Sequence, residues 1–221
     1  MIEIIATSVA DALEIEAGGG NRIELVSHLN EGGLTPSTEL IKGVIDAVKI
    51  PVHVIIRPHS NSFVYTDEEI RQMKKDIEFA KASGASGVVI GVLTPENKID
   101  TKKLEDLLSV CQGLKVTFHR AIDETDPVES LKILVKYEEI TNILTSGGIK
   151  SPLAQNTAVL KEMVEKSAHI NILVGGGLTM DNVMKVADIT KAKNFHFGDA
   201  ARVDNQVKRE KVEILINKIA I

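Results

Sequence analysis

The sequence predicts a (β/α)8 barrel, the TIM barrel fold, formed by residues 1–221 as a single domain. Eight short apolar runs with β-branched residues recur along the chain, and roughly 20 to 35 residues separate their starts, which leaves room for one crossover helix each. No linker, charge block or low-complexity segment divides the chain. A doubly wound open sheet, the alternative, usually has fewer strands for this length.

The apolar runs place the strands. Val, Ile, Phe and Thr, which favour extended backbone, dominate them. In chain order we expect strands at 2–6, 22–26, 52–57, 87–91, 115–119, 142–145, 171–174 and 194–198.

Capping residues mark the starts of several helices, at Thr35, Thr66, Asp100, Asp126 and Thr179. Thr35 and Asp126 each precede a proline, which suits the first helical position. Thr66 forms a capping box with Glu69. These signals predict a helix after most of the strands.

Apolar side chains at helical spacing mark the buried faces of helices at 40–48, 70–77 and 104–111. Cys111 shares its face with Leu104 and Leu107, so we interpret it as a packed core residue. A last helix at 207–219 keeps the same spacing and can cover the barrel.

Composition excludes several classes of protein. One cysteine rules out an intramolecular disulfide framework, and the chain has no 18-residue apolar run for a membrane helix. The net charge of −5 and only five Phe and two Tyr, with no Trp, do not suit nucleic-acid binding. The N-terminal segment lacks the basic start of a signal peptide. We therefore expect a cytoplasmic protein with no nucleic-acid or membrane partner.

Alternation along the strands places polar side chains inside the barrel, where branched aliphatic residues are usual. The inward positions carry Glu3, Glu24, His53, Arg57, His119 and His196. Buried without partners, such groups would each lose several kcal/mol, so they either pair with one another or face a wet pocket. Glu3 and His53, early in their strands, favour a closed network. Arg57, His119 and His196, near the carboxyl ends, favour a site, while Arg120 faces the other way and is expected at the surface or behind the site.

Glycines follow three of the strands at the same rim. They serve as plain turns, or they let backbone N–H groups approach an anion such as phosphate. The candidate anion-binding residues are Gly147, Gly148, Gly175, Gly176, Gly177 and Gly198.

Several segments, in order along nearly the whole chain, resemble the CutC copper-homeostasis family: RIELVS (22–27), EGGLTPS (31–37), PVHVIIRP (51–58), GVLTP (91–95), VTFHRA (116–121), LTSGG (144–148) and FHFG (195–198). The resemblance implies a (β/α)8 barrel, a cytoplasmic location and a role in copper homeostasis, with copper as the implied metal. Many members carry cysteine where this chain has Val26, and some carry another where it has Val64. Because Cu(I) prefers thiolate or thioether ligands, we do not expect tight Cu(I) binding through sulfur here.

Two functional hypotheses remain open. In the first, the protein binds a metal ion through imidazole and carboxylate groups drawn from Glu24, His119, Asp123 and His196. In the second, it is an enzyme acting on a small anionic or phosphorylated metabolite, with Arg57 holding the anion, His119 as general acid or base and Glu24 as its partner or a second base. Glu24, Arg57 and His119 are thus the catalytic candidates, followed by Asp123 and His196. The sequence leaves the cofactor, the metal ligands and any homo-oligomer open.

Overall fold

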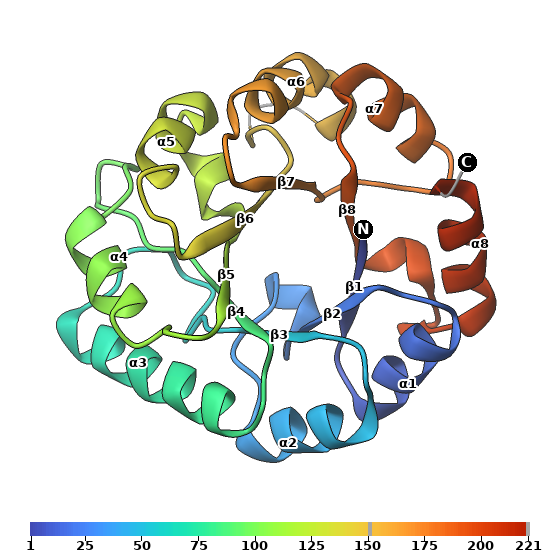
Figure 1. Ribbon diagram of the computed structural model, residues 1–221, viewed down its shortest axis with the longest axis horizontal. Coiled ribbons are helices and arrows are strands. Elements are labelled where there is room, and N and C mark those ends of the chain that lie inside the picture. Colours follow the sequence, from blue (N-terminus) through green and yellow to red (C-terminus); the bar gives the residue numbers. More distant parts are fainter. Residues whose placement is uncertain (150–151, 220–221) are drawn as a thin grey trace.

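The computed structural model describes residues 1–149 and 152–219. Within them, eight parallel strands pair in sequence order and close into a barrel, because β8 pairs with β1. Figure 1 looks down this barrel, with the helices forming an outer ring. The predicted (β/α)8 barrel is confirmed. The strands are β1 (Ile2–Ala6), β2 (Arg22–Leu25), β3 (Val52–Ile55), β4 (Gly87–Ile90), β5 (Lys115–Phe118), β6 (Ile140–Thr145), β7 (Asn171–Val174) and β8 (Asn194–Phe197).

The α-helices follow the strands and cover the outside of the barrel (Figure 1). Their bounds are α1 (Val9–Ala17), α2 (Thr38–Ala47), α3 (Asp67–Ala82), α4 (Thr101–Leu108), α5 (Pro127–Leu134), α6 (Thr157–Lys166), α7 (Val183–Thr190) and α8 (Arg209–Ile219). The capping box at Thr66 is confirmed at the start of α3, as are the caps by Asp100 on α4 and Asp126 on α5.

Two predicted helix starts are wrong. Ser37, not Thr35, caps α2, because Thr35 is tied to the end of β3: its hydroxyl accepts a hydrogen bond from the Arg57 N–H at 2.8 Å. The Thr179 hydroxyl accepts the N–H groups of the turn that precedes α7, and the helix itself begins at Val183. In both places a side chain suited to capping a helix accepts a different hydrogen bond instead, from a distant strand end at Thr35 and within a local turn at Thr179.

The outer faces of the strands form the main apolar core against the helices, as alternation predicts. Phe118 on β5 and Phe195 and Phe197 on β8 are at most 1% exposed. Burying a side chain of this size stabilises the fold by about 1.5–3 kcal/mol. Because this layer holds the strands at fixed tilt and register, it also fixes where the inward side chains meet.

A small element that sequence patterns did not predict lies between β8 and α8. The short helix η4 (Asp199–Ala201) leads into a hairpin of β9 (Arg202–Val203) and β10 (Gln206–Val207). The Arg202 guanidinium donates to the Asp11 carboxylate at 3.0 Å, and this carboxylate also accepts the Val207 N–H at 2.9 Å. The hairpin is therefore anchored to α1. Among the described residues, every helix falls short of the length and apolar character needed to cross a membrane.

Candidate functional site

The six polar side chains assigned to the inner face are all buried, none being more than 8% exposed: Glu3, Glu24, His53, Arg57, His119 and His196. They fall into two groups. Those from the beginnings of the strands contact other buried side chains, whereas those nearer the carboxyl ends line a cavity.

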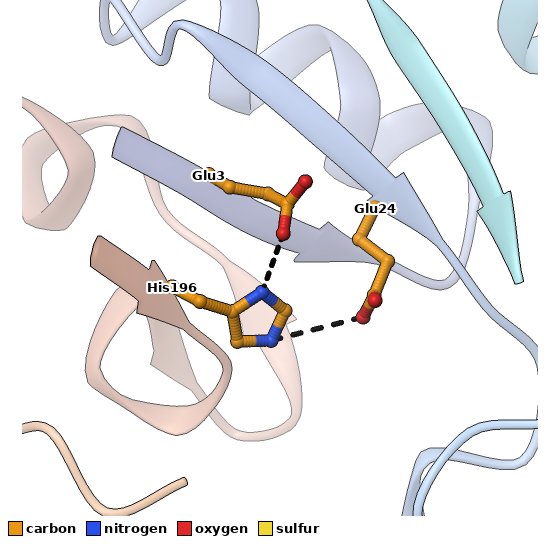
Figure 2. Close-up of side chains that lie close together, drawn as sticks. All are labelled: Glu3, Glu24 and His196. Atoms are coloured by element: carbon orange, nitrogen blue, oxygen red, sulfur yellow. Dashed lines mark hydrogen bonds and ion pairs between the residues drawn. The ribbon is translucent and has the colours of Figure 1, made fainter. Parts of the chain in front are cut away.

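Glu3 is the centre of the first group. Its carboxylate accepts a hydrogen bond from Arg22 Nε at 2.5 Å. It accepts another from His196 Nδ1–H at 2.7 Å, which Figure 2 shows. Burial raises the pKa of Glu3, but Arg22 and then His196 outweigh it and hold the pKa at about 2. Arg22 is not among the predicted inward residues, although the alternation that turns Glu24 inward applies equally to residue 22.

His53 is also buried, but among the described residues it makes no hydrogen bond with Glu3 or Arg22. Its Nδ1 lies 3.4 Å from the Thr117 hydroxyl, and the ring packs against Gly87, where a Cβ would lie 2.6 Å from Nε2. Burial, with Arg22 adding to it, lowers the pKa of His53 to about 3. This histidine is neutral and structural, and it does not line the cavity.

A cavity of about 640 Å³ opens at the carboxyl ends of the strands. Glu24, Arg57, His119 and His196 all line it. The structure thus brings the three catalytic candidates of the sequence together, with His196 as a fourth. Barrel enzymes carry their sites at this end, on side chains from several different strands.

Glu24 connects the cavity with the buried group below it. Its Oε2 lies 3.7 Å from His196 Nε2, too far for a hydrogen bond but close enough for strong charge attraction (Figure 2). Burial is the largest influence on Glu24 and raises its pKa to about 7, although His196 opposes it. For His196, burial lowers the pKa, but the two carboxylates overcome it and the net direction is upward. Glu24 is therefore poised to exchange a proton near neutral pH.

His119 begins the short helix η2 (Arg120–Glu124), and its Nδ1 accepts the Ala121 N–H at 3.1 Å. In the neutral ring the proton then lies on Nε2, which has no hydrogen-bond partner among the described residues. Burial, followed by the charge of Arg57, lowers the pKa of His119 to about 3. A role as general base near neutral pH does not fit this ring. It is instead a neutral hydrogen-bond donor.

Arg57 is held rigidly beside the cavity. Its Nη1 donates to the carbonyl oxygens of Glu31 and Gly33 at 3.1 and 3.2 Å, and its Nη2 to that of Ser60 at 3.4 Å. The guanidinium also stacks 4.8 Å from the centre of the Phe63 ring. Because carbonyl oxygens take up these donors, Arg57 provides a fixed positive charge rather than a free fork for a ligand.

Asp123, which the sequence suggested after the three catalytic candidates, does not line the cavity. Its carboxylate accepts hydrogen bonds from the hydroxyls of Thr145 and Ser146 at 2.5 and 2.7 Å, and from the N–H groups of Ser146 and Gly148. The Gly147 N–H donates to the Thr145 hydroxyl. The N–H of Gly148 thus binds an internal carboxylate and that of Gly147 a neighbouring hydroxyl, and neither glycine lines the cavity.

The remaining glycines divide in the same way. Gly176, Gly177 and Gly198 line the cavity. Gly175 does not, because its N–H continues the sheet by donating to the Thr145 carbonyl at 3.0 Å. Backbone N–H groups near an anion are therefore expected after β7 and β8 only.

Comparison with known proteins agrees with the fold and with the resemblance of the sequence. Residues 1–201 match the CutC family. The chain belongs to the CutC family. It is 39% identical over 210 residues to the human copper homeostasis protein cutC homolog, covering 94% of this chain and 76% of the human protein. It is 37% identical over 217 residues to the family protein CutC of Bacteroides thetaiotaomicron, covering 96% and 86%.

Solved structures show the same relationship. The crystal structure of a CutC protein from Streptococcus agalactiae, assigned to copper homeostasis, superposes with a TM-score of 0.84 at 35% identity, over 90% of this chain and 97% of that one. Phosphoribosyl anthranilate isomerase from Thermococcus kodakaraensis reaches a TM-score of 0.68 at 16% identity, over 99% and 97% of the two chains, which shows a shared fold only.

Whether Cu(I) fits this CutC chain depends on where its sulfur atoms lie, because Cu(I) prefers sulfur ligands. Val26, where many CutC members carry cysteine, is 1% exposed and packs with Ile5, Ile55 and Val89. Burial raises the pKa of the Cys111 thiol to about 12, and this cysteine lies outside the cavity wall. Neither position offers a thiolate, so the site does not fit Cu(I).

Glu3, Glu24 and His196 are the described residues that could hold another metal ion, with one ligand atom of each within 4.8 Å of the others. Two carboxylates and one imidazole suit a divalent cation. Arg22, bonded to Glu3, opposes added positive charge, and His196 already donates its Nδ1 proton to Glu3.

Proposed function

We propose that the cavity is the active site of an enzyme that performs acid–base chemistry on a small anionic organic molecule, with Glu24 as the proton-transferring group. The observation that carries this proposal is the pairing of two groups whose pKa values the barrel drives in opposite directions. The pKa of Glu24 is raised to about 7, and that of His119 in the same cavity is lowered to about 3. In such a pair one residue can act as the base while the other acts as a neutral hydrogen-bond donor.

The chemistry that suits this pair is proton removal from a carbon next to a carbonyl group. The Glu24 carboxylate takes the proton, the electron pair of the C–H bond forms the C=C bond of an enolate, and the π pair of the carbonyl group moves to its oxygen. The Nε2–H of His119 then stabilises this developing oxyanion as a neutral donor. The proton returns from Glu24 to carbon or oxygen, while the fixed charge of Arg57 favours an anionic substrate.

Exchange of hydrogen for deuterium tests this reaction without knowledge of the final product. Small carbonyl compounds that carry a carboxylate or a phosphate are incubated with the protein in D2O, and loss of the C–H signal is followed by NMR. We expect exchange that rises through about pH 7 as Glu24 ionises and that falls at least about 100-fold in Glu24→Gln.

Glu165 on α6, whose side chain is 63% exposed, provides the control. Glu165→Gln should leave the exchange rate unchanged. Equal exchange in Glu24→Gln and the native chain, or no exchange with any compound of the panel, would refute the proposed reaction.

We also propose that the protein acts in the cytoplasm and contributes to copper homeostasis, the role stated in the names of its relatives. One observation favours direct metal binding as a second candidate function, namely the close approach of Glu3, Glu24 and His196. Titration with Cu(II) and Zn(II) tests it. Binding of one equivalent that is lost in both Glu24→Gln and His196→Ala would support this site, whereas binding that survives both changes would place the metal elsewhere.

A further inference from the structure

Arg120, expected from its strand parity to lie at the surface or behind the site, lines the cavity. It is also held in a fixed position. Its Nε donates to Asp123 at 2.8 Å, and its Nη2 to the Ser146 hydroxyl at 3.3 Å. Asp123 is itself only 2% exposed and is fixed by the loop after β6. A buried carboxylate thus orients a guanidinium whose side chain remains 45% exposed.

Gly176, in the loop after β7, leaves the space that the Arg120 guanidinium occupies. A Cβ at Gly176 would lie 2.6 Å from the guanidinium carbon, so any side chain there would displace the group. Gly176 also has a φ of +79°, which glycine adopts without strain. The guanidinium therefore lies directly over the backbone of this loop, at the rim of the cavity.

One end of the guanidinium stays free. Among the described residues, Nη1 of Arg120 makes no hydrogen bond, whereas Nε and Nη2 are both engaged. An arginine that is oriented from behind and keeps an N–H-bearing nitrogen at a cavity rim is prepared for a negatively charged oxygen.

The charges nearby favour the same kind of ligand. Arg57 and Arg120 both line the cavity together with His119, so two fixed positive charges face it. The Nε2–H of His119 adds a buried donor that has no acceptor within residues 1–149 and 152–219. Asp123, the ion-pair partner of Arg120, already accepts several hydrogen bonds and does not reach the cavity. The carboxylates that do line it, on Glu24, Asp181 and Asp199, are matched there by Arg57, Arg120, Arg202 and Lys211.

We propose that Arg120 binds the charged oxyanion group of the substrate, a carboxylate or a phosphate. This inference rests on the proposed function and specifies its substrate class. The ligand is a small carbonyl compound whose charged end contacts Arg120, whose carbonyl oxygen meets His119 and whose acidic carbon lies toward Glu24. Asp123 and Gly176 act as positioning residues for the guanidinium.

Binding of two simple anions tests this assignment. The native chain is titrated with inorganic phosphate and, separately, with malonate, by calorimetry and by thermal shift. We expect at least one anion to bind and to raise the melting temperature. In Arg120→Met the dissociation constant of that anion should rise about 10- to 100-fold, the effect of losing a charge-assisted contact. If only phosphate binds, the substrate is a phosphate ester. If only malonate binds, the substrate carries a carboxylate.

Three further variants make the result specific. Arg71→Met removes an exposed arginine of α3 and should bind the anion like the native chain. Arg120→Lys keeps the charge, but one ammonium group cannot reach both Asp123 and the anion, so its affinity should also fall; this variant decides the question if Arg120→Met does not fold. Glu24→Gln should keep anion binding, which separates a failure of the proposed catalysis from a failure of this site. Unchanged affinity in both Arg120 variants, or no binding of either anion to the native chain, would overturn the proposal.

Discussion

Replacing Glu24 by glutamine should make the protein more stable at pH 8, although it removes a buried charged group. The pKa of Glu24 is raised from its ordinary 4.5 to about 7 in the folded chain, with burial as the main cause. Between these values the unfolded chain carries the charge and the folded chain does not. Ionisation therefore favours unfolding, and the native protein loses stability as the pH rises through this interval.

The interval sets the size of the effect. From 4.5 to about 7, at about 1.4 kcal/mol per pH unit, it corresponds to roughly 3 kcal/mol. This destabilisation is absent below pH 4.5 and complete above pH 7. Because His196 loses a carboxylate neighbour in the variant, part of the gain is offset and roughly 3 kcal/mol is an upper limit.

Urea unfolding of the native chain and of Glu24→Gln at pH 5 and pH 8 measures the difference. We expect nearly equal free energies of unfolding at pH 5 and a more stable variant at pH 8. The exposed Glu165→Gln should follow the native chain at both values. A difference between Glu24→Gln and the native chain that does not change with pH, or a variant that is less stable at pH 8, would refute the raised pKa.

Three other outcomes follow from the structure. Asp123→Ala should lower the free energy of unfolding by about 3–5 kcal/mol in a urea titration, since it leaves buried donors and Arg120 without their carboxylate; a loss below about 1 kcal/mol would contradict this. In NMR titration the His119 ring should stay neutral from pH 5 to pH 8, with the proton on Nε2, and a midpoint near the ordinary 6.5 would show that the ring is not buried as described. In an anaerobic titration against a competing Cu(I) chelator the protein should bind no Cu(I) tightly, because the Cys111 thiol is buried and protonated; stoichiometric binding that disappears in Cys111→Ser is the contrary result.

The sequence predicts the barrel and its inward side chains closely, because both depend on local pattern. Alternation along a strand requires only extended backbone, so it correctly turns Glu3, Glu24, His53 and His196 inward. Convergence of Glu24 and His119 on one rim follows from the closure of parallel strands. These inferences need no knowledge of which side chains touch.

Contacts between strands that are distant in the sequence could not be predicted. Glu3 and His196 meet because β1 pairs with β8, with Glu3 directly opposite His196. Neither segment of the sequence indicates the register in which these two strands pair. Burial, followed by the charge of Arg57, keeps the His119 ring neutral, and the hydrogen bond from the Ala121 N–H places its proton on Nε2. Neither influence can be read from residue type, which suggested a titrating ring. Arg120 lies in η2, beyond the end of β5, so strand alternation does not apply to it, and its contacts with Asp123 and Ser146 hold the side chain at the cavity.

The chain of charges Arg22–Glu3–His196–Glu24 also constrains how this protein can diverge. Replacing Glu3 alone by an aliphatic residue would leave the buried Arg22 guanidinium without its carboxylate, which destabilises by about 3–5 kcal/mol, whereas joint replacement of the group by well-packed apolar residues is often neutral or better. We therefore expect Glu3 to be lost only together with Arg22. A homologue with an apolar residue in place of Glu3 and with Arg22 retained would have a destabilised barrel.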